Sequence, residues 1–160
     1  MAQIKVVTVN IGLQDGSFAI GYEAYAGACG CGIYSALAVG AYAGAGACAA
    51  VALGYYAMAG GGTDGSVVVG ATANAGYCAA NAVVIGYSTR VDLGACGAVA
   101  VGACAFAIRP YSIVLGYGAT DSDRCTAAIA FAFGPCGSHR VSVASDVWIN
   151  FCNRLNNGCI

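Results

Sequence analysis

Charged residues are scarce in this chain, and so are long aliphatic runs. Asp, Glu, Lys and Arg make up 8% of the 160 residues, against about a quarter in an average globular protein, and the formal net charge is −1. A balance this close to zero excludes the basic footprint of a nucleic-acid-binding protein. With so few charges, the fold or an assembly of several chains must solve the problem of solubility.

The stretch from residue 24 to residue 63 carries no charge at all, which is long enough for a membrane span. Its content argues against insertion, because it holds ten glycines and fourteen alanines but only five Ile, Leu or Val residues. Interior glycine also weakens helices. The opening "MAQIKVVTVNIGLQDGS" has no basic region followed by an apolar one, so no secretory signal is expected.

What the chain does have is an internal repeat. Short apolar tripeptides end on a small residue every 14 to 19 positions, and these small residues serve as anchors: Gly21, Gly40, Gly54, Gly70, Gly86, Gly102, Gly116, and then Ala130 and Ala144. A period of this length predicts a solenoid built from one supersecondary unit per repeat.

The residue before each anchor is always Ile, Val or Leu. In the seven glycine repeats this column is Ile20, Val39, Leu53, Val69, Ile85, Val101 and Leu115. Bulky residues stand three before the anchor and smaller ones two before, a period of two that predicts a strand. We expect the seven residues to form one interior ladder, and the Ala/Gly face to be buried against another chain.

A strand repeating at this interval needs a return path, and alanines at three and five after the anchor supply it, as in Ala43 and Ala45. The economical arrangement is a stack of flattened coils, each with two short strands and two turns, about 4.8 Å apart. Directly after the anchor, large and small residues alternate from Tyr22 to Tyr117. Stacking in register would leave each alanine beside a tyrosine ring.

The repeats "SFAIGYEAYA" from Ser17, "SALAVGAYAGA" from Ser35, "AVALGYYAMA" from Ala50 and "SVVVGATANA" from Ser66 resemble the head repeats of YadA-type trimeric autotransporter adhesins. Similar repeats occur in phage fibre proteins. The resemblance covers roughly residues 17–133. It implies a left-handed parallel β-roll of about eight to nine coils, a homotrimer, and a role in adhesion.

No autotransporter signal or membrane-barrel anchor is visible, so the chain resembles a phage fibre, spike or capsid-attached module more closely. We expect an N-terminal attachment or capping strand over 1–16, a β-roll over 17–145, and a C-terminal cap or tip over 146–160. The expected location is the virion surface, with other virion proteins and a host cell-surface molecule as partners. The alternatives are an ice- or surface-binding solenoid and a bacterial surface adhesin head, which would be extracellular or on a cell surface.

Polar and aromatic residues that break the repeat concentrate in residues 134–160, where specificity can be built. The receptor-contact candidates are His139, Arg140, Asp146, Trp148, Asn153, Arg154, Asn156 and Asn157.

No catalytic constellation, metal site or cofactor site is expected. The "CGC" at 29–31 lacks a second ligand pair, "TDSD" at 120–123 lacks the spacing of a calcium loop, and a turn histidine is favoured over a Cys136–His139 dyad. Six of the ten cysteines fall on turns or late return segments: Cys29, Cys31, Cys48, Cys78, Cys96 and Cys125. Without an export signal, we expect most of the ten to be reduced and to act as small hydrophobes.

Overall fold

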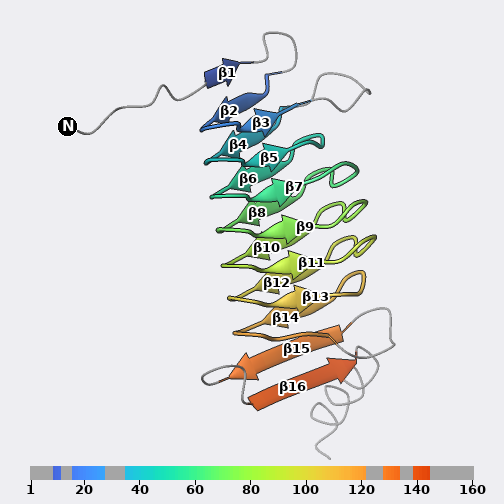
Figure 1. The fold of residues 1–160 in the computed structure, drawn as a ribbon. Coiled ribbons are helices and arrows are strands. Elements are labelled where there is room, and N and C mark those ends of the chain that lie inside the picture. The colour runs from blue at the N-terminus through green and yellow to red at the C-terminus, as the bar shows by residue number, and fades with distance from the viewer. Residues whose placement is uncertain (1–8, 12–15, 28–34, 122–127, 134–138, 145–160) are drawn as a thin grey trace, which may run out of the picture.

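The computed structural model describes residues 9–11, 16–27, 35–121, 128–133 and 139–144, and these residues form an all-β solenoid of about six turns (Figure 1). Each turn contains a three-residue strand, a sharp turn, a two-residue strand and a longer loop. The sharp turns line the left edge of the stack in Figure 1, and the longer loops line its right edge. This is the flattened coil that the repeat predicts.

The three-residue strands belong to a ten-stranded sheet, called sheet A here. In their order across the sheet its strands are β1 (Val9–Ile11), β2 (Phe18–Ile20), β4 (Leu37–Val39), β6 (Val51–Leu53), β8 (Val67–Val69), β10 (Val83–Ile85), β12 (Val99–Val101), β14 (Ile113–Leu115), β15 (Ala128–Phe133) and β16 (His139–Ala144).

The two-residue strands form a six-stranded sheet, called sheet B. Its strands are β3 (Tyr25–Ala26), β5 (Gly44–Ala45), β7 (Met58–Ala59), β9 (Asn74–Ala75), β11 (Arg90–Val91) and β13 (Phe106–Ala107). All pairs within sheet B are parallel and in register, and so are the pairs from β2 to β14 in sheet A. Strand β15 is also parallel to β14.

Glycine at the anchors lets successive coils stack closely. The anchor glycines have φ between 115° and 143°, which L side chains rarely adopt. A Cβ placed on Gly70 would also lie 2.1 Å from the carbonyl oxygen of Gly86 in the next coil. The anchor column therefore excludes side chains for both conformational and steric reasons.

The interior consists mainly of alanine. The middle residue of each described parallel strand in sheet A is fully buried, as in Ala19, Ala52 and Val84. The return alanines at three and five after the anchor complete this core, as Ala43 and Ala45 show. The predicted return segment is confirmed.

The predicted interior ladder is wrong in its direction. The seven residues do form one in-register column, as the pairs Val39↔Leu53 and Ile85↔Val101 show. The column points outward, however, and Ile85 keeps 39% of its surface exposed while the alanine or valine beside it in each strand is buried. The space between two sheets of so thin a coil fits alanine, so the bulky face of the strand lies outside.

The same result corrects the expected chain-to-chain contact. The small residues of sheet A fill the coil interior, so they are not available to another chain. The face that the structure leaves open to a partner is the Ile/Val/Leu face.

The last two repeats also differ from the expectation. Strand β15 is parallel to β14 but shifted by two residues from the repeat, because Leu115 pairs with Phe131 rather than with Ile129. Strand β16 then runs antiparallel to β15, with Ile129 opposite Val143. Only the five residues "GPCGS" separate these strands, which suffices for a hairpin but not for a parallel return.

The N-terminal end of sheet A is also closed by an antiparallel strand, since Val9–Ile11 pairs with β2.

Between the two ends of sheet A, buried hydroxyl groups connect neighbouring coils by hydrogen bonds. Ser66 donates to the carbonyl of Ala79 at 2.9 Å and accepts from the N–H of Ala82 at 3.0 Å. Thr89 donates to the carbonyl of Gly102. These side chains are fully buried, and each bond satisfies a group that burial would otherwise leave unpaired.

Candidate functional site

The outer face of sheet A is a continuous apolar strip along the solenoid. It is formed by the first and third residues of the seven strands β2 to β14, and it contains no charged residue: Phe18, Ile20, Leu37, Val39, Val51, Leu53, Val67, Val69, Val83, Ile85, Val99, Val101, Ile113 and Leu115. Most are half-buried by neighbours in the same column, while Ile85 and Ile113 are exposed at 39% and 38%. An apolar strip of this length is typical of a protein interface.

The sharp turns form a second surface, at the left edge of Figure 1. Each turn runs from the anchor glycine to the residue three later, with bonds such as Ala43 N–H to the Gly40 carbonyl at 3.3 Å. The third residue of the turn has a positive φ, as in a type II turn. Glycine is the usual residue there, yet this column reads Glu23, Tyr42, Tyr56, Thr72, Ser88, Cys104 and Gly118.

Backbone hydrogen bonds confirm that the residues directly after the anchors stack in register. The N–H of Tyr42 donates to the carbonyl of Tyr22, and the N–H of Tyr56 donates to the carbonyl of Ala41. Tyr22, Ala41 and Tyr55 therefore follow one another along this edge. Large and small side chains therefore alternate along this edge of the solenoid, as they do in the sequence.

Four tyrosine side chains gather at this edge, and we call them the tyrosine corner: Tyr22, Tyr42, Tyr55 and Tyr56. The rings of Tyr42 and Tyr56 are stacked, with centroids 4.6 Å apart and an interplanar angle of 19°. Tyr42 also meets Tyr22 edge-on at 5.3 Å, and Tyr55 meets Tyr56 edge-on at 4.9 Å. The space left by Ala41 is thus occupied by Tyr42 from the adjoining column.

The tyrosine corner remains open to solvent despite these contacts. Tyr22, Tyr55 and Tyr56 keep 52%, 53% and 44% of their surface exposed. The pKa of Tyr42 is raised above its usual value of 10.0, first because the packed surroundings remove water from its hydroxyl, and then because Glu23 adds negative charge nearby. The corner therefore combines partly exposed tyrosine rings, phenolic hydroxyls and one carboxylate.

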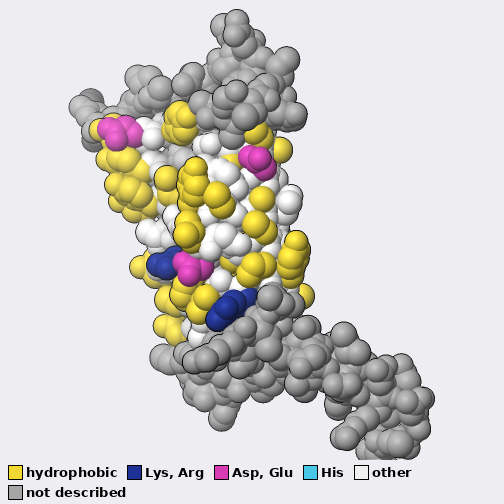
Figure 2. All heavy atoms as spheres, turned by 90° about the vertical axis from the view of Figure 1, so that its right-hand side faces the viewer, with side chains coloured by type: hydrophobic (Ala, Val, Ile, Leu, Met, Phe, Trp, Pro, Cys, Tyr) yellow, Lys and Arg dark blue, Asp and Glu magenta, His cyan; other side chains and the backbone are white. Residues whose placement is uncertain are grey.

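The longer loops form a third surface, which faces the viewer in Figure 2. Hydrophobic side chains and backbone cover most of its described area, and charged side chains appear at a few places. Tyr77 and Tyr111 are 63% and 70% exposed. Each ring lies over a glycine of the preceding coil, since a Cβ on Gly61 would be 2.9 Å from Tyr77 and one on Gly97 would be 2.8 Å from Tyr111. These tyrosines shield backbone and do not form a cluster.

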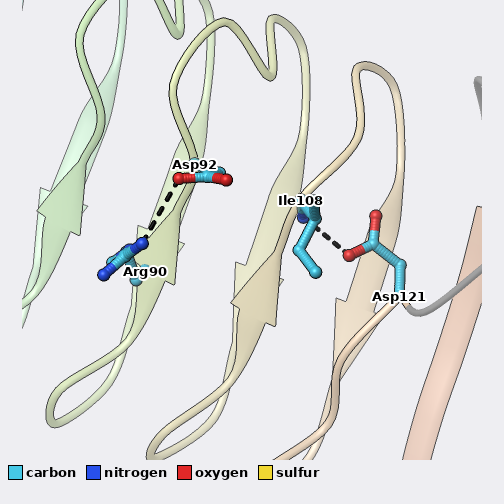
Figure 3. A network of polar contacts seen from close by, with 4 residues as sticks. All are labelled: Arg90, Asp92, Ile108 and Asp121. Atoms are coloured by element: carbon cyan, nitrogen blue, oxygen red, sulfur yellow. Dashed lines mark hydrogen bonds and ion pairs between the residues drawn. The ribbon is translucent and has the colours of Figure 1, made fainter.

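Two acidic side chains near the loops, Asp121 and Asp92, form polar contacts within the protein. The carboxylate of Asp121 is fully buried and accepts hydrogen bonds from the N–H of Ile108 at 2.6 Å and of Arg109 at 3.0 Å. In the coil before that of Ile108, Arg90 forms an ion pair with Asp92 at 3.3 Å (Figure 3) and lies over the Phe106 ring at 4.6 Å. Asp121, part of the "TDSD" segment, thus has a structural role that the sequence did not reveal.

In the part of the chain that the structure describes, Cys78, Cys96 and Cys104 carry free thiols. The Cys96 thiol donates to the Cys78 carbonyl at 3.0 Å across two successive coils. Cys29, Cys31 and Cys125 lie outside the described residues, so the expected state of the ten cysteines remains a prediction.

The structure describes two of the eight receptor-contact candidates, and only by their backbone. His139 and Arg140 stand in β16, opposite Phe133 and Ala132. Asp146, Trp148, Asn153, Arg154, Asn156 and Asn157 lie outside the described residues, as does the whole of the expected tip, 146–160. Sequence reasoning missed the tyrosine corner. A run of aromatic residues just after successive anchors, "GYE", "GAY" and "GYY", was the signal that could have found it.

Among the described residues, no group of three or more His, Cys, Asp or Glu side chains is arranged to hold a metal ion. No helix long and apolar enough to cross a membrane is present in the same part of the chain. Comparison with protein-family models, with curated proteins and with solved structures found no match.

Proposed function

We propose that this chain is a structural and adhesive component of a virion, a fibre, spike or capsid-attached module that presents a trimeric β-roll to a host surface. The single observation that carries the proposal is the outward Ile/Val/Leu strip on a regular parallel solenoid. Such a body is stiff along its axis and has one long face suited to burial against copies of itself. The resemblance of its repeats to adhesin heads and phage fibres points the same way.

The homotrimer belongs to this proposal. Three copies that bring their sheet A strips together would cover these outward Ile, Val and Leu side chains, whereas sheet B, with Arg90 and Asn74 on its outer side, would remain in water. An interface of this kind should bury well over the roughly 800 Å² per partner of a standard complex. The left-handed coil is a further part of the proposed β-roll, as is a count of about eight coils, since β16 forms a hairpin with β15 and not a ninth coil.

The polarity of the module is proposed from the sequence. Residues 134–160 form the distal tip, with the eight candidates from His139 to Asn157 in contact with a host molecule, and residues 1–16 attach the module to the particle. An ice-binding surface is less well supported. Thr63 and Thr89 are fully buried, and the outer columns of sheet A contain no threonine.

Particle imaging and host adsorption test this function. Antibodies against the chain should decorate intact particles, and purified full-length protein should compete with particles for adsorption to host cells. Deletion of 134–160 should remove the competition and leave particle assembly intact. Absence of the chain from purified particles would contradict the virion role, and a buried C-terminal segment would reverse the polarity.

A further inference from the structure

The tyrosine corner interrupts the uniformity of the solenoid. Thr72, Ser88 and Cys104 occupy, in later coils, the turn position that Tyr42 and Tyr56 occupy in earlier ones. That position has a positive φ, where a bulky residue is disfavoured and glycine is favoured. The fold therefore does not need tyrosine at this point, and the later coils form the same turn without it.

Contacts between the rings bury only part of the surface of the four tyrosines. Tyr42 and Tyr56 stack on one another, but Tyr22, Tyr55 and Tyr56 each leave about half of the side chain in water. Tyrosine supplies a rigid contact area with a polar rim at a small cost in conformational entropy. Side chains of this kind, side by side on a rigid scaffold, are suited to bind a flat ligand with one apolar face.

The charge beside the tyrosine corner restricts the chemical class of ligand that can bind there. Glu23 follows Tyr22 directly in the chain and occupies, in its coil, the turn position that Tyr42 occupies in the next one. The pKa of Tyr42 is raised in part by this carboxylate. The phenolic hydroxyls donate and accept hydrogen bonds and the carboxylate accepts them, so both can bind the hydroxyl groups of a ligand. The negative charge of the carboxylate disfavours an anionic ligand. Tyr42 is in direct ring contact with Tyr22 and with Tyr56, so an ammonium group cannot lie between these rings as it does in an aromatic cage.

We propose that the tyrosine corner is a binding site for neutral saccharides. One face of a pyranose ring is formed by C–H groups and packs on an aromatic ring, while its hydroxyls meet the tyrosine rim and Glu23. This inference rests on the proposed host attachment and names the ligand class for it. The site lies on the shaft, in the coils of β2, β4 and β6, whereas β16 is at the opposite end of sheet A.

Glycine substitutions test the site, because glycine suits a positive φ and stands in the same column at Gly118. The variant carries Tyr42→Gly and Tyr56→Gly. The matched control carries Thr72→Gly and Ser88→Gly, the same change in the same column away from the corner. Calorimetry of the full chain against cellotriose, chitotriose, N-acetyllactosamine and its sialylated form measures binding, with tetramethylammonium as a cationic probe.

At least one neutral saccharide should bind the unmodified chain and the control alike, and the variant should bind it about tenfold more weakly or not at all. Glu23→Gln should reduce the preference for the neutral form over the sialylated one. Sedimentation and circular dichroism must show the same assembly and fold in all chains, and Tyr22→Ala, outside the positive-φ column, is the second variant if the first fails to fold.

The inference is overturned if no neutral saccharide binds at millimolar concentration, if only the sialylated sugar or tetramethylammonium binds, or if variant and control weaken equally. Its failure is separable from that of the proposed function. Full-length chain that adsorbs to host cells equally well with and without the tyrosine corner contradicts the inference alone. Chain that binds neutral saccharides but is missing from particles contradicts the virion role alone.

Discussion

The buried carboxylate of Asp121 accepts a hydrogen bond from the backbone N–H of Ile108 at 2.6 Å. Strand β13 is the last strand of sheet B, and among the described residues Thr120 alone continues its ladder, as a single bridge to Phe106. Asp121 thus provides the acceptor that a further strand would otherwise provide to the N–H groups after β13. An end of a solenoid has to be closed in some such way.

Removal of this carboxylate should destabilise the C-terminal part of the solenoid. Asp121→Ala leaves the N–H groups of Ile108 and Arg109 without their acceptor, so the free energy of unfolding should fall by about 1–3 kcal/mol. Asp121→Asn keeps one acceptor oxygen and should lose less. Chemical denaturation of the three chains measures this, and equal stability of Asp121→Ala and the unmodified chain would refute the capping role.

Enlargement of an interior alanine should be more harmful than enlargement of an alanine at the sharp turns. Ala100 is fully buried inside the coil, so Ala100→Leu should lower the free energy of unfolding by about 1–3 kcal/mol. Ala103 stands in the column that holds Tyr87 and Tyr117 in neighbouring coils, so Ala103→Leu should change stability by less than about 0.5 kcal/mol. Similar losses in the two variants would contradict the assignment of inside and outside.

The anchor column should not tolerate a side chain. Gly70→Ala would bring a Cβ to within 2.1 Å of the Gly86 carbonyl oxygen, and the coils would have to separate. We expect loss of the cooperative unfolding transition. Gly94→Ala is the control, because Gly94 also has a positive φ but has no atom within 4 Å of the added carbon. It should cost only about 1–2 kcal/mol, and a folded Gly70→Ala variant would argue against close stacking at the anchors.

Alkaline solution should weaken the fold in part through Tyr42. Its pKa is raised in the folded chain, so above the usual value of 10.0 the folded state holds a proton that the unfolded state has lost. The free energy of unfolding therefore falls as pH rises from about 10 through the raised pKa, and below pH 10 this group contributes no pH dependence. Tyr42→Phe should make the decline above pH 10 less steep, and an unchanged slope would show that Tyr42 does not contribute.

From β2 to β14, the repeat in the sequence was enough to predict the coils, their two strands and their register. A column such as Val39, Leu53 and Val69 establishes both the strand and its partners, because bulky residues recur at one position of every repeat. It does not say which side is inside when both faces are apolar. The volume of the coil decides that, since the narrow space between two strands accommodates Ala52 but not a ladder of leucine and isoleucine.

Other features depended on contacts that no single repeat contains. The tyrosine corner arises because Tyr42, in one turn column, enters the space beside Ala41 in the other, and this needs the positive φ of the turn as well as the stacking of coils. The capping by Asp121 joins residues 12 and 13 positions apart. The reversal at β16 was visible in principle, because "GPCGS" is short and rich in turn residues, but the regular spacing of the anchors concealed it.

The central claim is that copies of this chain associate through the outer strip of sheet A. Sedimentation velocity at micromolar concentration tests it most directly, with the unmodified chain, Val69→Asp on the outer strip, and Asn74→Asp on sheet B as the matched control. We predict that the unmodified chain and the control sediment as trimers and that Val69→Asp does not. A stable monomer of the unmodified chain, or a trimer that Val69→Asp leaves intact, would contradict the claim.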